Sequence, residues 1–95
     1  MTMIDLATTL VRKSTAATAE VDGQLVALDI DSGSCYGLNK VATRIWDLIA
    51  VPTTPESVVA ALMADYDVDL AVCQEQTLDL INDLGREGLV DVVSG

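Results

Sequence analysis

The sequence predicts an α+β domain in which a three-stranded antiparallel sheet is followed by three helices, a winged-helix-like βββααα order. Short strand-like segments separated by turn residues occupy positions 15 to 38, and helical periodicity begins at position 39. Strands first and helices second is typical of α+β folds. The 95 residues suit one domain, expected over 14–93, with a flexible arm or an extra strand over 1–13.

Three strands are expected over residues 15–21, 24–30 and 34–38. Asp22-Gly23 is a strong signal for a two-residue hairpin. Asp31-Ser32-Gly33 forms the second loop, because glycine tolerates positive φ and Asp and Ser hydrogen-bond their own turns. Two consecutive hairpins put residues 24–30 in the middle of the sheet. Residues 34–38 therefore form an edge strand.

Three helices are expected after Asn39, Thr54 and Asp69, each of which is a good N-cap residue. The third helix ends near Gly88, a C-terminal cap after which the chain folds back through Leu89. The apolar stripes at helical spacing predict which side chains face the core. These are Ala42, Ile45, Trp46 and Ile49; Val58, Val59, Leu62, Met63 and Tyr66; and Cys73, Thr77, Leu80, Ile81 and Leu84.

The composition argues against several classes of function. The net charge of −10 opposes binding to nucleic acid. The chain has no His, no Gly-rich phosphate loop and no nucleophile beside a base, so no enzyme, cofactor or metal site is expected. Cys35 and Cys73 are expected to be free, buried thiols. Without a signal-peptide pattern or a long apolar run, a cytoplasmic protein with no membrane partner is expected.

The edge strand of residues 34–38 is the main candidate binding site. An exposed edge is a template for pairing with another chain, and this strand contains no Lys or Pro to prevent it. Gly37 weakens a strand, which suggests that another backbone comes close there. A peptide added as a fourth strand is one such backbone. The alternatives are that the arm of residues 1–13 covers the edge, or that a second copy does so in a dimer.

Two other functions fit parts of the pattern. Winged-helix proteins combine similar elements and usually bind DNA, but the third helix here carries four acidic residues and only Arg86 as a base. Acyl carrier proteins have an Asp-Ser pair like Asp31-Ser32, but in them a helix begins at the Ser. Here Gly33 and a strand follow. A transcription regulator stays open as an alternative, and a carrier protein is disfavoured.

Several segments together resemble the PqqD-like family. They are the acidic-Gly hairpin in "EVDG", "GLN" entering a helix, "IWDL" two turns later, "LMADYDVD" and the closing "LGREGLV". The resemblance covers about residues 15 to 93 and implies the same βββααα order. It also implies a recognition element for ribosomally synthesised, modified peptides, which is a non-catalytic adaptor that binds the leader peptide of a precursor.

The resemblance places the leader peptide on the edge strand, in a groove against the third helix. Leu80 and Leu84 also belong to the predicted core, and which flank of the helix faces the strand stays open. Asp79 and Asp83 either meet basic residues of the peptide or form a solvated face. The positions that carry over are Ser34, Cys35, Tyr36, Gly37 and Leu38 on the strand, and Gln76, Asp79, Leu80, Asp83 and Leu84 on the helix.

Two branches of the family are distinguished by short motifs. Members that assist pyrroloquinoline quinone synthesis typically have "PEG" in the hairpin and "DG" after the first helix, where this chain has "DSGSC" and "AVPTTPES". The chain looks more like the stand-alone members of lasso-peptide synthesis. That branch implies two partners, a transglutaminase-like leader peptidase and an asparagine-synthetase-like macrolactam cyclase. A PqqD-type peptide chaperone is the alternative, and the state is a monomer or a dimer.

Overall fold

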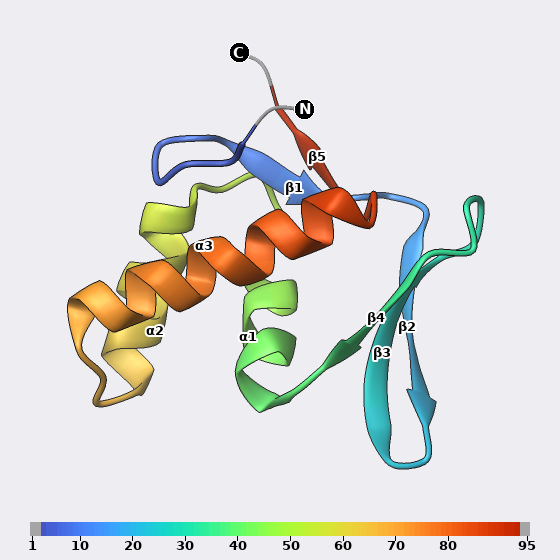
Figure 1. The fold of residues 1–95 in the computed structure, drawn as a ribbon, viewed down its shortest axis with the longest axis horizontal. Coiled ribbons are helices and arrows are strands. Elements are labelled where there is room, and N and C mark those ends of the chain that lie inside the picture. The colour runs from blue at the N-terminus through green and yellow to red at the C-terminus, as the bar shows by residue number, and fades with distance from the viewer. Residues whose placement is uncertain (1–2, 94–95) are drawn as a thin grey trace.

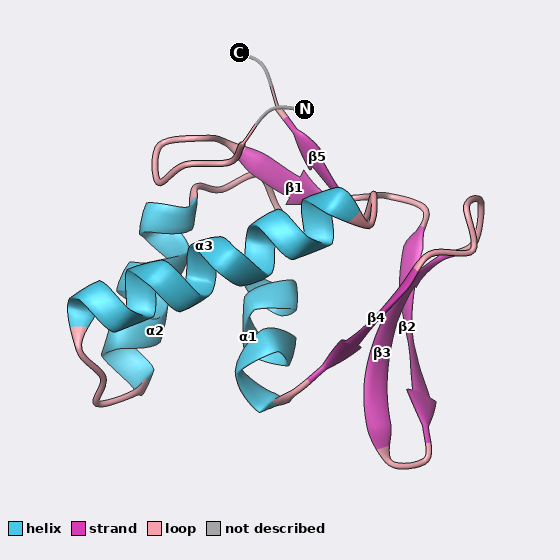
Figure 2. Cartoon of the chain, viewed as in Figure 1, coloured by secondary structure: helices cyan, strands magenta, loops and turns pink. Residues whose placement is uncertain are grey.

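The computed structural model describes residues 3–93 and has the predicted α+β class (Figures 1 and 2). Three strands form an antiparallel sheet in the order β2-β3-β4, so β3 is central. Residues 1 and 2 of the predicted arm lie outside the described range. The sheet strands and the helices that follow are β2 (Ala16–Val21), β3 (Gln24–Asp29), β4 (Cys35–Leu38), α1 (Lys40–Leu48), α2 (Pro55–Asp65) and α3 (Leu70–Arg86).

A second sheet joins the two ends of the chain. β1 (Leu10–Arg12) pairs antiparallel with β5 (Val90–Val92), and β5 as a strand was not predicted. On its other side Leu10 exchanges two backbone hydrogen bonds with Thr53, of 2.7 and 2.9 Å. Leu10 is fully buried. Residues 10–12 are therefore integrated into the core, whereas the domain boundary at residue 13 stays a prediction.

The predicted turns and helix caps are confirmed. Asp22 and Gly23 both have positive φ, 52° and 80°, as a type I′ hairpin requires. The side chains of Asn39, Thr54 and Asp69 each accept a backbone N–H from the first turn of the helix that follows. These local interactions explain why the helix starts could be located from the sequence.

The end of α3 also matches its prediction. Gly88 has φ +73° and donates its N–H to the carbonyl of Gly85 at 3.1 Å, while Leu89 donates to Leu84 at 2.9 Å. This is the Schellman arrangement, which satisfies the last carbonyls of a helix. Leu89 is fully buried and leads into β5.

Two predicted core residues are exposed instead. Cys35 is exposed, because it alternates along β4 with Tyr36, and Tyr36 takes the inward face. Tyr66 is 36% exposed and has extended backbone angles at the end of α2. The helical spacing that predicted its inward position no longer applies there. Cys73 is buried, as expected.

Asp29 forms a buried polar network at the end of β3. Its carboxylate accepts hydrogen bonds from Thr15 Oγ1 at 2.6 Å and Ser32 Oγ at 2.8 Å, and Lys13 Nζ lies at 3.4 Å. The Thr15 hydrogen bond, then that of Ser32, with a smaller contribution from the Lys13 charge, lowers the pKa of Asp29 from 3.8 to about 2. The network ties the segment before β2 to the central strand.

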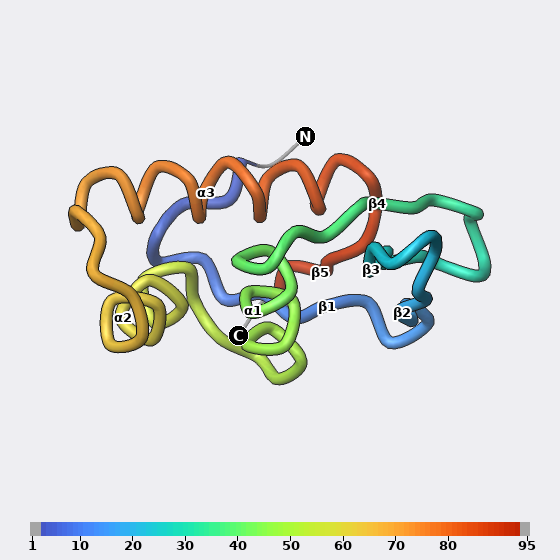
Figure 3. The backbone as a smooth tube through the Cα atoms, turned by 90° about the horizontal axis from the view of Figure 1, so that it is seen from below, coloured from blue at the N-terminus to red at the C-terminus, as the bar shows by residue number. Residues whose placement is uncertain are grey.

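The long helix α3 crosses the molecule, with the β2–β3 hairpin near its C-terminal end and α2 near its N-terminal end (Figures 1 and 3). In the view of Figure 3, β4 runs beside α3 toward α1. Within residues 3–93, no helix combines the length and hydrophobicity needed to cross a bilayer.

Candidate functional site

β4 is an open edge of the three-stranded sheet. It pairs with β3 along one side only. The N-terminal segment, as far as residues 3–93 describe it, pairs through β1 with β5 and Thr53 instead. The alternative in which this segment covers the β4 edge is therefore wrong for the described residues.

The register shows which backbone groups of β4 face the open side. The N–H of Asp29 donates to the carbonyl of Ser34 at 2.9 Å, so Ser34 directs its backbone toward β3. Antiparallel pairs alternate, so Tyr36 and Leu38 also bond toward β3, while Cys35 and Gly37 direct their N–H and C=O groups outward. The main-chain contacts predicted for all of residues 34–38 are thereby narrowed to two residues.

The Gln24 side chain occupies the space beside the α-carbon of Gly37. A Cβ placed there would meet only the Gln24 side chain, with Nε2 at 2.9 Å and Cδ at 3.6 Å. Nε2 is the end of a flexible side chain that can move away. Apart from its strand partner Val26 in β3, no backbone is recorded close to Gly37 within residues 3–93, so the additional close backbone suggested by the sequence is not an internal one.

One flank of α3 is turned toward β4. Tyr36 is half-buried, and its hydroxyl donates a 3.3 Å hydrogen bond to Asp83 Oδ2. Asp83 also forms an ion pair with Arg86 through its other oxygen. We call Gln76, Leu80 and Asp83 the strand-facing flank of α3. The bond from Tyr36 shows which flank of the helix faces the edge strand, which the sequence left open.

An apolar pocket of about 370 Å³ begins where β4 ends. Its deeper residues, which include Ile45, Leu62 and Cys73, belong to the core. Exposed apolar side chains that cluster around a pocket mark binding surfaces. Three such side chains contribute to this one: Val41 at 43% exposure, Val68 at 42% and Tyr66 at 36%. Gln76 and Leu80 of the strand-facing flank also line it.

Most of the ten predicted site residues lie on β4 or on the strand-facing flank of α3, but not all of them do. Cys35, Tyr36, Gly37 and Leu38 form β4, and Gln76, Leu80 and Asp83 lie on the strand-facing flank. Asp79 is exposed one turn before Asp83. Ser34 precedes the strand and uses its carbonyl internally. Leu84 is fully buried, so in this structure it supports the site from within the core and has no surface to offer a ligand.

Sequence reasoning missed the contributors from the ends of the first two helices. Val41 lies in the first turn of α1, whereas Tyr66 and Val68 follow α2, and only the packed helices bring these two segments together. A detectable signal existed, because Val41 and Val68 are apolar residues outside the predicted inward stripes. Among the described residues, no group of three or more His, Cys, Asp or Glu side chains is arranged to hold a metal ion.

The fold and site define a small winged-helix-like domain with an open sheet edge beside a helix and an apolar pocket at the end of that edge. The chain belongs to the PqqD family: the family model, described as "Coenzyme PQQ synthesis protein D (PqqD)", matches residues 24–90. No curated protein matches the chain.

Two solved structures are similar to this chain. TbiB1 in complex with the TbiA(beta) leader peptide is 27% identical, with a TM-score of 0.74 over 90% of this chain and 99% of that one. A lasso peptide synthetase B1 complexed with the leader peptide is 23% identical, with a TM-score of 0.71 over 86% of this chain and 96% of that one. The second likeness concerns the fold alone.

Proposed function

We propose that this protein is a non-catalytic adaptor that binds the leader peptide of a ribosomally synthesised precursor by strand addition to β4. The unpaired β4 edge carries this proposal, because Cys35 and Gly37 direct their backbone groups to a side that the described chain leaves open. The similarity to TbiB1, whose structure contains a leader peptide, supports it.

The peptide pairs with β4 through the backbone groups of Cys35 and Gly37. Side chains of an added strand point alternately to the two faces of the sheet. Those on the inner face meet the strand-facing flank of α3, and an apolar side chain beyond the end of β4 enters the 370 Å³ pocket. Asp79 and Asp83 give this side a negative charge, which favours a neutral or basic leader.

The adaptor delivers the precursor to enzymes of lasso-peptide synthesis. Its partners in this proposal are a transglutaminase-like leader peptidase and an asparagine-synthetase-like macrolactam cyclase. Holding the leader near an enzyme converts an encounter between two molecules into a local one, which raises the effective concentration of the precursor. Residues 14–93 form the recognition domain, and residues 1–13 precede it.

A second candidate is a PqqD-type peptide chaperone of pyrroloquinoline quinone synthesis. The description of the matching family model favours it. It uses the same edge and differs in the precursor that it binds. A precursor of the quinone pathway and a lasso precursor, titrated in parallel, distinguish the two candidates by affinity.

The proposal is tested by titrating the protein with a synthetic leader of the precursor encoded beside its gene. Calorimetry is expected to show saturable binding, and amide NMR shifts are expected along β4 and the strand-facing flank of α3. The amide of Thr18 on the opposite edge strand, β2, serves as the internal control. Absence of saturation at high micromolar peptide, or shifts centred on β2, contradicts the proposal.

A further inference from the structure

A single hydrogen bond connects the edge strand to α3. It runs from Tyr36 Oη to Asp83 Oδ2 at 3.3 Å, and no other hydrogen bond in residues 3–93 joins β4 to α3. Hydroxyl–carboxylate hydrogen bonds are usually 2.5 to 3.0 Å long, so this contact lies beyond the strong range. This hydrogen bond therefore contributes little free energy to the contact between β4 and α3.

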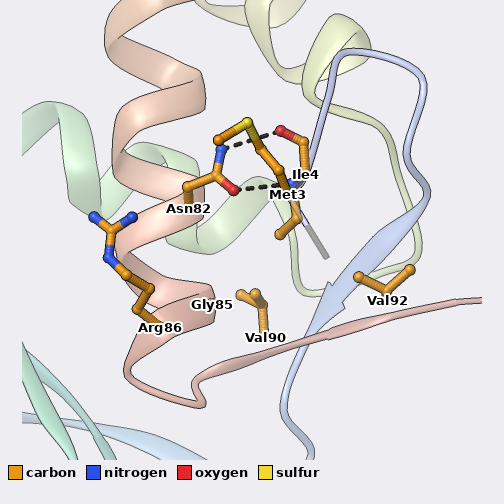
Figure 4. A pocket seen from close by; sticks show the side chains of 7 residues that line it. All are labelled: Met3, Ile4, Asn82, Gly85, Arg86, Val90 and Val92. Atoms are coloured by element: carbon orange, nitrogen blue, oxygen red, sulfur yellow. Dashed lines mark hydrogen bonds between the residues drawn. The ribbon is translucent and has the colours of Figure 1, made fainter. Parts of the chain in front are cut away.

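On the side away from β4, α3 is held by hydrogen bonds to the N-terminal segment. Asn82 Oδ1 accepts the N–H of Ile4 at 2.9 Å, and Nδ2 donates to the carbonyl of Ile4 at 3.0 Å (Figure 4). Nδ2 also donates to the carbonyl of Leu78 at 2.9 Å. Ile4 is buried, and its Cδ1 packs next to Gly85. We call Leu78, Asn82 and Gly85 the arm flank of α3. Its hydrogen bonds tie α3 to the N-terminal segment.

The strand is fixed as well, because β4 pairs along its length with β3. The Tyr36 ring packs against the core, and the hydroxyl at its end is the group that reaches α3. Asp83 stays paired with Arg86 when the phenol leaves, so no carboxylate is stranded. Tyr36 as a whole is half-buried, so a released hydroxyl can reach water. Breaking this hydrogen bond therefore leaves neither the hydroxyl nor the carboxylate without a partner.

We propose that the Tyr36–Asp83 hydrogen bond is a gate, closed in the free protein and opened when a peptide adds to β4. This inference rests on the proposed leader binding. The backbone groups that face the open side belong to Cys35 and Gly37, the two neighbours of Tyr36. A strand added there lies about 4.8 Å from β4. It passes directly over the position from which the phenol reaches α3.

According to this proposal the Tyr36 hydroxyl lowers the affinity for the leader, whereas an ordinary contact residue raises it. Tyr36→Phe keeps the ring and removes the hydrogen bond. Since the closed state alone loses this interaction, leader affinity is expected to rise about threefold to tenfold. The gain is expected in the association rate measured by stopped-flow fluorescence, because a larger fraction of the free protein is already open.

Two further variants isolate the gate. Ser57→Ala is the matched control, since it removes a side-chain hydrogen bond of 3.1 Å to Thr54 at the start of α2. It is expected to leave leader affinity unchanged. Asp83→Ala opens the same gate from the other side, so adding Tyr36→Phe to that variant is expected to bring no further gain. Denaturant unfolding of each variant verifies that the fold is kept.

Each outcome of this comparison decides the proposal. Equal or weaker affinity of Tyr36→Phe overturns it, as does a gain that persists in the Asp83→Ala background. If the wild-type protein and every variant fail to bind the leader, the proposed function fails and the gate falls with it. If the wild-type protein binds and only the gain is absent, leader binding stands and the gate alone is rejected.

Discussion

The two flanks of α3 are partnered in opposite ways. On the arm flank, Asn82 bonds to the backbone of Ile4, and β1 pairs with β5 nearby, with a pocket of about 290 Å³ beside Asn82 and Gly85. On the strand-facing flank, one long hydrogen bond reaches β4, whose outer backbone groups have no partner among residues 3–93. The comparison teaches that the chain completes the backbone hydrogen bonding on one side of its central helix, whereas on the other side the outer backbone groups of β4 have no partner within residues 3–93.

The largest effect is expected on the completed side, from Leu10→Ala. Leu10 is fully buried in β1, and removing a buried leucine side chain costs about 3 kcal/mol through lost burial and the cavity left behind. Urea unfolding measures the loss. Val51→Ala, at a position that is 64% exposed, is the control and is expected to change stability by less than about 0.5 kcal/mol. A cost for Leu10→Ala below about 1 kcal/mol would mean that β1 contributes little to the fold.

A smaller loss is expected from Asn82→Ala, which removes both hydrogen bonds to Ile4. The unpaired backbone groups of Ile4 are expected to cost about 1–2 kcal/mol. Hydrogen exchange of the Ile4 amide is expected to accelerate with it. Glu75→Ala, an exposed change on the same helix, should leave that amide protected. Equal protection of Ile4 in the two variants would show that the contrast between the flanks does not depend on Asn82.

Gly37→Val tests the side of the molecule on which β4 leaves its outer backbone groups unpaired. Leader affinity is expected to fall about tenfold, or ~1.4 kcal/mol, because the new side chain displaces Gln24 and narrows the approach of an added strand. The fold should be kept, since only the flexible end of Gln24 must move. Calorimetry of Gly37→Val beside Thr18→Val, a similar change on β2, measures the effect. Unchanged affinity for Gly37→Val would show that nothing passes close to this glycine.

The last prediction concerns Asp29, whose contribution to stability is present at neutral pH and is lost in acid. The folded-state pKa of about 2 lies below the ordinary value of 3.8, so the carboxylate stabilises the fold fully above pH 3.8. That stabilisation is lost as the pH falls from about 4 toward 2. Unfolding free energies measured between pH 6 and 2 are expected to converge for the wild-type protein and Asp29→Asn. Parallel curves would exclude Asp29 as the titrating group.

The features that depend on neighbouring residues could be predicted from the sequence. Asp22-Gly23, the N-caps and Gly88 act within a few residues, so their structures follow from local hydrogen bonds and backbone preferences. β5 could not be predicted, because a strand of three residues shows no measurable period. Its partner β1 lies at the opposite end of the chain, so no local signal connects them.

The candidate site shows the same limit. The sequence located the edge strand, since consecutive hairpins fix the strand order. It did not show that only Cys35 and Gly37 direct their backbone outward, which depends on the register with β3. It also placed Tyr66 in the core, whereas the chain leaves the helix at this residue and turns the side chain into the wall of a pocket.

The sheet has two outer edges, β2 and β4, and neither contains a Lys or Pro. Such edges promote aggregation when two copies meet. The net charge of −10 makes copies of this protein repel one another at a distance, and that repulsion is short-ranged at physiological salt, where the Debye length is about 8 Å. Colloidal stability in this molecule thus depends on total charge instead of on protective residues within the strands, and concentrated salt removes that protection.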